Sequence, residues 1–128
     1  MPVQLNHTIV HATDALTASS FLSEILGLPA PRKFGPFWMV ETANGVSLDY
    51  IAGDEPLTTE HYAFLVSEAE FDAIFRRIRD RKLDYWADPF AQHPGEINHN
   101  DGGRGVYFRD PSGHYLEIIT RPYGSGAP

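Results

Sequence analysis

The chain has 128 residues, of which 42% are hydrophobic and 21% charged, a composition typical of one globular domain with a single core. Its formal net charge of −7 argues against a general nucleic-acid binder, which needs a basic face, and no apolar run approaches the ~20 residues of a membrane span. The absence of cysteine excludes disulfides, thiolate metal ligands and a cysteine nucleophile; with no recognisable signal peptide, we expect a cytoplasmic protein.

The first half of the chain has the pattern of a strand, a helix and a hairpin. Residues 5–11 alternate between polar and apolar side chains, as a strand does. Thr13 or Asp14 can cap the start of the following helix, and Gly27 suits the left-handed position that ends it. Two hairpin strands around a loop that ends in glycine are predicted over residues 37–42 and 46–51.

The second half repeats this order. Residues 60–66 form the first predicted strand, and Ser67 and Glu70 then have the spacing of a capping box. The apolar stripe of the helix consists of Phe71, Ile74, Phe75 and Ile78. A second hairpin is predicted from the strands 105–109 and 114–120. Each half is therefore βαββ, or βαβββ if it holds a further short strand.

An internal repeat relates the two halves. Asn6–Val10 corresponds to Glu60–Phe64, and Asn44–Tyr50 corresponds to Ser112–Ile118, so each half offers one early histidine and one late carboxylate. The two histidines are 54 residues apart and the two carboxylates 68, so the second half holds an insertion of 14 residues, for which the irregular stretch 88–103 has room.

The repeat also sets the expected boundaries within this single domain. We expect a first module over residues 1–52 and a linker over 53–59. The second module then covers residues 60–122. A tail over 123–128, rich in glycine and proline, is predicted to be mobile.

Four side chains related by the repeat are candidate metal ligands: His7, Asp49, His61 and Glu117. Alternate residues of a strand share a face, and these four lie opposite the apolar faces that pack under the helices. A buried charge there needs a partner, which a divalent cation would supply. Two histidines and one carboxylate also leave coordination positions open for a substrate. The alternative interpretation is that duplicated strands share polar residues that bind no metal.

Tyr107 is the candidate for proton transfer. In a hairpin with the loop Pro111–Gly113, residue 107 pairs with residue 117, which places Tyr107 beside Glu117 on the same face. A tyrosine there can donate a hydrogen bond to a bound oxygen or act as an acid. The alternative is a tyrosine that only packs.

The whole chain resembles the vicinal oxygen chelate superfamily, most specifically over Glu60–Phe64 and Val106–Glu117. This superfamily contains glyoxalase I, type I extradiol dioxygenases, fosfomycin-resistance thiol transferases and bleomycin-binding proteins. The resemblance implies an α+β fold of two βαβββ modules, related by internal repeat, that form a half-open mixed-sheet barrel around the metal. It also implies a homodimer. The metal positions of the family fall on His7, His61 and Glu117, and Asp49 takes the place of the fourth ligand of glyoxalase I.

The resemblance implies a divalent-metal-dependent enzyme, with iron, manganese, nickel or zinc, that acts on a small oxygen-rich molecule. An extradiol-type dioxygenase is the most concrete expectation, because it accounts for Tyr107 and for His99 in the polar loop 92–104. A fosfomycin-type thiol transferase and a glyoxalase-like lyase remain open. So does a protein of another class, which sequesters a drug or metabolite between aromatic walls. We expect neither a nucleic-acid nor a membrane partner.

Overall fold

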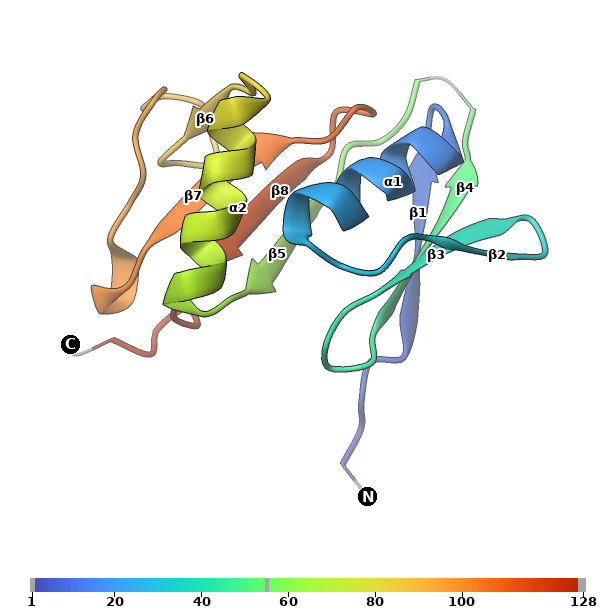
Figure 1. Ribbon diagram of the computed structural model, residues 1–128, viewed down its shortest axis with the longest axis horizontal. Coiled ribbons are helices and arrows are strands. Elements are labelled where there is room, and N and C mark those ends of the chain that lie inside the picture. Colours follow the sequence, from blue (N-terminus) through green and yellow to red (C-terminus); the bar gives the residue numbers. More distant parts are fainter. Residues whose placement is uncertain (1, 55, 127–128) are drawn as a thin grey trace. The chain divides into compact units, whose positions relative to one another are not determined.

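The computed structural model describes residues 2–54 and 56–126, and its fold is α+β (Figure 1). The chain divides between Thr58 and Thr59 into two compact units. Each unit has the order strand, helix and three strands, so the βαβββ repeat that the sequence predicted is confirmed. The further short strand, which the sequence left optional, is present in both units directly after the helix. It is β2 (Arg32–Phe34) in the first unit and β6 (Tyr85–Trp86) in the second.

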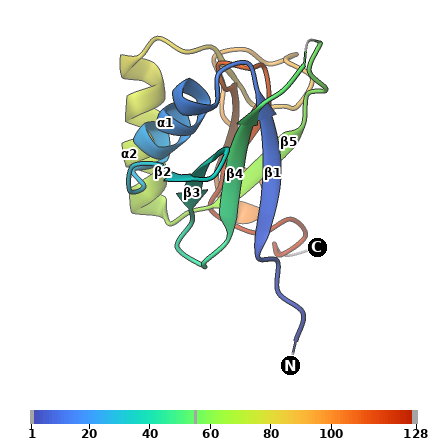
Figure 2. The ribbon, with the colours of Figure 1, turned by 90° about the vertical axis from the view of Figure 1, so that its right-hand side faces the viewer.

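The first unit is one open, mixed sheet with a helix on one face. Its strands are β1 (His7–Ala12), β3 (Phe37–Glu41) and β4 (Ser47–Ala52) together with β2, in the spatial order β1-β4-β3-β2. β1 runs parallel to β4, whereas the other pairs are antiparallel. The helix α1 (Ala15–Leu26) lies along one face of this sheet (Figure 2). Its buried side chains include Leu22 and Ile25, and those of the strands include Val40, Leu48 and Tyr50.

Both ends of α1 are closed as the sequence predicted. The Asp14 carboxylate accepts a hydrogen bond from the backbone N–H of Thr17 at 2.9 Å. Gly27 has a φ of 73° and ends the helix in the left-handed conformation, with its N–H donating to the Ser23 carbonyl. These two capping hydrogen bonds therefore set where α1 begins and where it ends.

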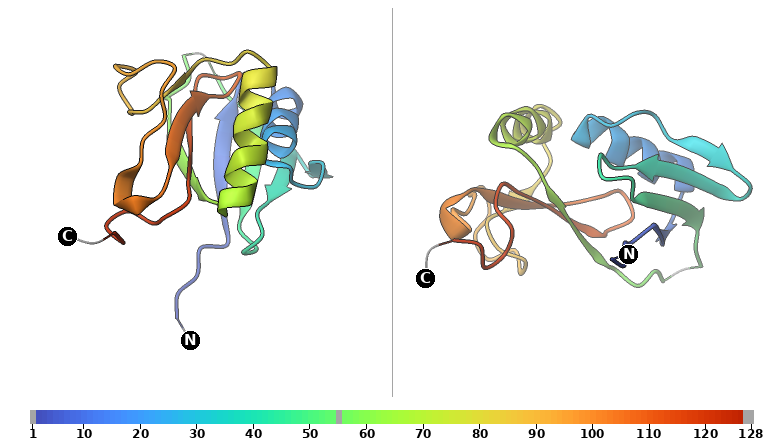
Figure 3. Two further views of the ribbon diagram at one scale, coloured as in Figure 1. Left: turned by 60° about the vertical axis from the view of Figure 1, so that its left-hand side comes forward. Right: turned by 90° about the horizontal axis from the view of Figure 1, so that it is seen from below.

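The second unit repeats the arrangement with β5 (His61–Leu65), α2 (Glu68–Asp80), β7 (Gly105–Arg109) and β8 (Tyr115–Ile119). The strand order is β5-β8-β7-β6, again with one parallel pair, β5 and β8. α2 crosses the face of its own sheet (Figure 3). It begins with the predicted capping box, in which Ser67 and Glu70 each bond the other's backbone N–H. The core beneath it consists of Phe71, Ile74, Ile78, Val106, Phe108, Leu116 and Ile118.

The connection between the short strand and the hairpin differs between the units. In the first unit only Gly35 and Pro36 join β2 to β3, whereas residues 87–104 join β6 to β7 in the second. This long connection is organised by polar side chains. Asp88 accepts hydrogen bonds from three backbone N–H groups, and the Asn98 amide donates to the Ala87 carbonyl at 2.9 Å. The loop therefore has a defined path along the site described below.

In the described part of the chain no helix is long and apolar enough to cross a membrane.

Candidate metal-binding face

The register of the second sheet sets which side chains share the face away from α2. Tyr107 of β7 lies directly opposite Glu117 of β8, as the hairpin argument predicted, and Trp86 of β6 continues the row. On the other side Ala63 of β5 is opposite Glu117, so His61 is its diagonal neighbour on the same face. The small side chain of Ala63 leaves room for the histidine to reach the carboxylate.

His61 and Glu117 meet on this face. The His61 Nε2 lies 2.9 Å from the Glu117 Oε1, and the Glu117 side chain is entirely buried while 43% of the His61 side chain is exposed. A buried carboxylate is stable only with hydrogen-bond or ionic partners. The pair therefore joins a buried anion to an imidazole that solvent and ligands can reach.

A second partner of Glu117 comes from the end of the chain. The Tyr123 hydroxyl lies 2.6 Å from both carboxylate oxygens of Glu117, so its one proton is shared between them. The Tyr107 hydroxyl lies 2.9 Å from the Tyr123 hydroxyl. Because Tyr123 directs its proton at Glu117, Tyr107 donates to Tyr123, and a chain of two hydrogen bonds ends on the carboxylate.

Both tyrosines of this chain stay protonated at neutral pH. Burial raises the pKa of the Tyr107 hydroxyl above its ordinary value, and the nearby Glu117 charge acts in the same direction. Burial also raises the pKa of Tyr123, and its hydrogen bond to Glu117 raises it further. Each hydroxyl is therefore a proton donor rather than a phenolate under physiological conditions.

An open hollow of about 700 Å³ lies next to this network. It belongs wholly to the second unit, and the side chains around it come from β5, β7, the loop before β7 and the C-terminal segment. The lining residues are His61, Pro89, Asn100, Asp101, Tyr107, Tyr123 and Gly124. The volume is in the range of small-molecule sites, and histidine and tyrosine groups converge on it.

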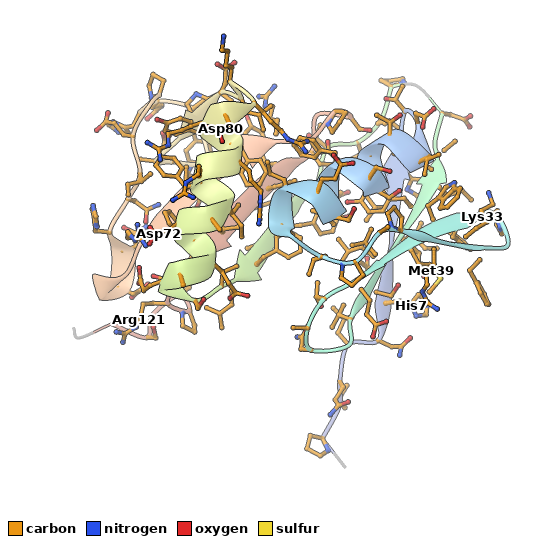
Figure 4. The ribbon with its side chains drawn as sticks, in the orientation of Figure 1. His7, Lys33, Met39, Asp72, Asp80 and Arg121 are labelled. Atoms are coloured by element: carbon orange, nitrogen blue, oxygen red, sulfur yellow. The ribbon has the colours of Figure 1, made fainter. Side chains whose placement is uncertain are left out.

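The other two predicted ligands lie on the first unit. His7 of β1 is opposite Ser47, and Asp49 of β4 is opposite Ile9, so the register puts both on the face away from α1. Met39 of β3 is opposite Asp49 and shares that face, and Figure 4 labels His7 and Met39 in the first unit. Asp49 is 9% exposed and accepts a hydrogen bond from the Ser47 hydroxyl at 2.5 Å.

The hydrogen bond of His7 leaves one ring nitrogen suited to a metal. The His7 Nδ1 lies 2.8 Å from the Asn6 side-chain oxygen, which accepts, so the imidazole carries its proton on Nδ1. Nε2 then holds the lone pair. A histidine that donates from one nitrogen and ligates through the other is the usual arrangement in metal sites.

The four predicted ligands are thus divided between the units. Within residues 2–54 and 56–126 no three histidine or acidic side chains gather as a metal would need, and each unit contributes one histidine and one acid. The donor types nevertheless fit a divalent metal. Glu117 is a buried carboxylate in contact with an accessible imidazole nitrogen, and one cation can replace the hydrogen bond between them.

His99 is exposed at the start of the short 3-10 helix Asn100–Gly102 and makes no capping hydrogen bond with its side chain. The residues after it, Asn100 and Asp101, line the hollow instead. Asn98, its other neighbour, bonds Ala87 and the backbone N–H of Asn100 and so holds the loop.

Tyr123 is the residue of the site that the sequence did not identify. Glycine and proline surround it, so no strand or helix periodicity predicts where its side chain lies. The only signal in the sequence is an aromatic residue shortly after a strand that carries a predicted ligand.

Comparison with known proteins gives a consistent result. The family model described as "Glyoxalase/Bleomycin resistance protein/Dioxygenase superfamily" matches residues 4–118. The solved structure of Oxidase ChaP-H1 is 63% identical, with a TM-score of 0.94, over 96% of this chain and 99% of that chain. Oxidase ChaP-H2 is 62% identical, with a TM-score of 0.96, over 99% and 100%. Glutathione transferase FosA of Serratia marcescens is 28% identical over 122 residues, 89% of this chain and 78% of the relative.

Proposed function

Because the chain belongs to the glyoxalase/bleomycin resistance protein/dioxygenase superfamily, we propose that it is a divalent-metal-dependent enzyme that oxidises a small oxygen-rich molecule with dioxygen. The observation that carries the proposal is the contact of 2.9 Å between the His61 Nε2 and the buried Glu117 carboxylate, at the edge of an open hollow. Ring cleavage of a catechol-like compound is the most concrete reaction, in which both atoms of dioxygen enter the substrate and no further reductant is needed.

In this proposal His61 and Glu117 hold the metal, with His7 as the second histidine. Asp49 is a fourth ligand, either directly or through water. When bound, a divalent metal supplies Lewis-acid binding of substrate oxygens and open positions for dioxygen, which among iron, manganese, nickel and zinc favours iron.

The chain's own residues orient the substrate and handle protons. The hollow beside His61 accepts the organic part of the substrate. The Tyr107 hydroxyl, which keeps its proton, exchanges its hydrogen bond to Tyr123 for one to a substrate oxygen. His99, on the loop beside the hollow, is the proposed acid–base group that reaches the substrate when the loop closes over it.

The relatives favour oxidation over the other reactions of the family. The two proteins named as oxidases are 62–63% identical to this chain over nearly its full length. The glutathione transferase FosA, at 28% identity, supports a thiol transferase as the second candidate. A glyoxalase-like lyase, with Asp49 as the extra ligand, and a drug- or metabolite-binding protein that needs no metal are less well supported.

A metal-binding assay tests the first half of the proposal. The purified protein is stripped of metal and reconstituted without oxygen with iron, manganese, nickel or zinc. We expect stoichiometric binding of a divalent metal, and loss of that binding in Glu117→Gln, which keeps the volume of the buried side chain. Glu96→Gln is the matched control, because the Glu96 side chain is 65% exposed on the loop and pairs with His93. Wild-type protein with no affinity for any of the four metals would overturn the proposal.

A substrate screen tests the second half. The reconstituted protein is incubated with catechols, with epoxides plus thiols, and with hemithioacetals. We expect oxygen consumption with members of the first group. Thiol consumption without oxygen uptake would identify the protein as a transferase instead of an oxidase. Tight ligand binding without metal or turnover would favour the binding protein.

A further inference from the structure

We propose that the segment Pro122–Gly126, here called the C-terminal strap, positions the Glu117 carboxylate for the metal through the hydroxyl of Tyr123. The inference rests on the proposed metal site and assigns to it a residue from outside the strands. Tyr123 is a positioning residue in this role, because it acts on a ligand rather than on the substrate.

The buried Glu117 carboxylate has close hydrogen-bond partners among the described residues. They are the His61 Nε2 at 2.9 Å and the Tyr123 hydroxyl at 2.6 Å from each oxygen. If a metal binds His61 and Glu117 together, the direct bond between them is lost, because the imidazole lone pair and one carboxylate oxygen now point at the cation. The Tyr123 hydroxyl is then the partner that remains for the other oxygen.

This geometry also selects how the carboxylate binds. The Tyr123 hydroxyl is equidistant from both oxygens, which is the position that a bidentate cation would occupy. With the hydroxyl there, Glu117 would offer a metal the oxygen on the side of His61. A monodentate carboxylate leaves more coordination positions open for a substrate.

The strap is attached to the loop that lines the hollow. The Asp101 carboxylate accepts hydrogen bonds from the backbone N–H groups of Gly124 and Gly126, each at 3.2 Å. Gly126 passes so close to Asp101 that an added Cβ would lie 2.5 Å from its Cα. Only glycine allows this approach, so the glycines of the strap serve to attach it.

The strap also holds its own shape. The Ser125 N–H donates to the Pro122 carbonyl at 3.1 Å, which closes a turn around Tyr123 and Gly124, and Gly124 has a φ of 75°. The turn and the Asp101 anchor together fix where the Tyr123 ring enters the site. Its hydroxyl also accepts from Tyr107, so the strap orders the proposed proton donor as well.

The first test is the metal affinity of Tyr123→Phe. The substitution removes one hydroxyl from a residue that is 61% exposed, so we expect the fold to remain. We expect the affinity for manganese or cobalt, measured by competition with a chromophoric chelator, to fall about tenfold or more, as for other residues that orient a metal ligand. Tyr115→Phe is the matched control, because Tyr115 lies on the same face of β8 but bonds Arg109 instead of Glu117.

A spectroscopic readout separates positioning from mere stability. The visible absorption of the cobalt-loaded protein reports the ligands and the geometry of the metal. We expect Tyr123→Phe to change this spectrum and Tyr115→Phe to leave it as in the wild type. A role in stability alone would lower the melting temperature and leave the spectrum unchanged.

A second variant tests the strap without touching the hydroxyl. Gly126→Ala obstructs the approach to Asp101, so it is expected to weaken metal binding in the same direction as Tyr123→Phe. Ser125→Ala, in the same turn, is the control and is expected to bind metal as the wild type does.

The outcomes are distinct. Wild-type protein that binds no metal overturns both the proposed function and the strap. Equal affinity and equal spectra for the wild type and Tyr123→Phe overturn the strap and leave the proposed function standing. Tighter binding by Tyr123→Phe also overturns it, since the hydroxyl would then compete with the metal for Glu117.

Discussion

Glu117 is the residue on which the proposed chemistry depends, and its surroundings explain why it is an acid rather than a packing residue. Its neighbours on β8 at positions 116 and 118 point into the core under α2, whereas Glu117 faces the other way and is nevertheless fully buried. An anion in that place destabilises the fold unless donors surround it. His61 and Tyr123 provide them, so the site is stable before any metal binds.

Tyr107→Phe is expected to retain the metal and to lose turnover by on the order of 10²-fold. The ring still packs, and only the proton donor is removed. Tyr62→Phe is the control, because Tyr62 lies on the opposite face of the second sheet. The measurement is steady-state kinetics with the metal content determined for each variant, and unchanged turnover in Tyr107→Phe would assign the tyrosine a packing role.

His99→Ala is expected to have a smaller effect than Tyr107→Phe. The side chain is exposed on the loop, so it acts only in the part of the cycle in which the loop is closed. His93→Ala, from the same loop, serves as the comparison. A loss of turnover in His99→Ala as large as in Tyr107→Phe would instead mean that the histidine is close to the substrate throughout.

Asp110 gives a pH-dependent prediction. Burial raises the pKa of its carboxyl group above the ordinary value, and among the residues that the structure describes its buried Oδ2 has no hydrogen-bond partner. Because the folded pKa lies above the unfolded one, wild-type stability falls as the pH rises from about 4 through the folded pKa. Asparagine does not ionise, so Asp110→Asn lacks this dependence on pH.

Urea unfolding of wild type and Asp110→Asn at pH 4 and pH 7 checks this. We expect the free energy of unfolding of Asp110→Asn to increase relative to that of the wild type as the pH rises. A difference that is constant, or that moves in favour of the wild type, would contradict the prediction.

At the scale of the elements, β-strand register and helix caps place the site. The hairpin of β7 and β8 turns through Gly113, at a φ of 92°, and this turn sets the pairing that puts Tyr107 opposite Glu117. The helix α2 covers the apolar face of the same sheet and so directs the polar face toward the hollow. A slip of one residue in β8 would bury the site under the helix.

The capping box of α2 gives a prediction at this scale. Ser67→Ala is expected to lower the free energy of unfolding by about 1 kcal/mol, because a backbone N–H at the helix start loses its acceptor. The hydrogen bonds to Ser67 also lower the pKa of the Glu70 carboxyl group. The stabilisation that the Glu70 carboxylate gives the fold is therefore present above the unfolded pKa and is lost as the pH falls through the folded pKa.

Glu70→Ala should accordingly destabilise the protein at pH 7 and have less effect at pH 3, in urea unfolding followed by circular dichroism. Glu24→Ala, on the other helix and outside any capping box, is the comparison. An effect of Glu70→Ala that is as large at pH 3 as at pH 7 would contradict the assignment to the charged cap.

At the scale of the whole molecule, each of the two units carries half of the proposed ligand set. The first carries His7 and Asp49 and the second carries His61 and Glu117, so neither completes the set alone. Each sheet is open, and in the described part of the chain β1 and β5 are edge strands that pair on one side only, with β4 and β8. Large apolar side chains on these strands are exposed, including Ile9 at 47% and Leu65 at 63%.

We therefore expect a homodimer, in which a second copy covers strand edges and apolar surface. Sedimentation equilibrium at micromolar concentration checks this, and Leu65→Glu is expected to shift the equilibrium toward the monomer. A wild-type protein that sediments as a monomer at these concentrations would contradict the expectation.

The sequence by itself determined the elements and much of their register. Alternation, helical stripes and capping residues are local patterns, so they predicted the βαββ order of both units, the ends of α1 and the capping box of α2. The further short strand in each unit was implied by the resemblance to the superfamily. The glycine turn after Asp110 likewise predicted the pairing of residues 107 and 117, and the motifs around His61 and Glu117 indicated the superfamily to which the chain belongs.

The tertiary structure decided what depends on contacts between distant or irregular segments. No periodicity describes the strap, so only the folded chain shows that Tyr123 reaches Glu117 and that Gly124 and Gly126 attach to Asp101. The path of the loop before β7 was also decided there, because side-chain hydrogen bonds rather than strand pairing hold it. A local pattern specifies the direction of a side chain on a strand, whereas its burial and its partners follow from the packing of the whole unit.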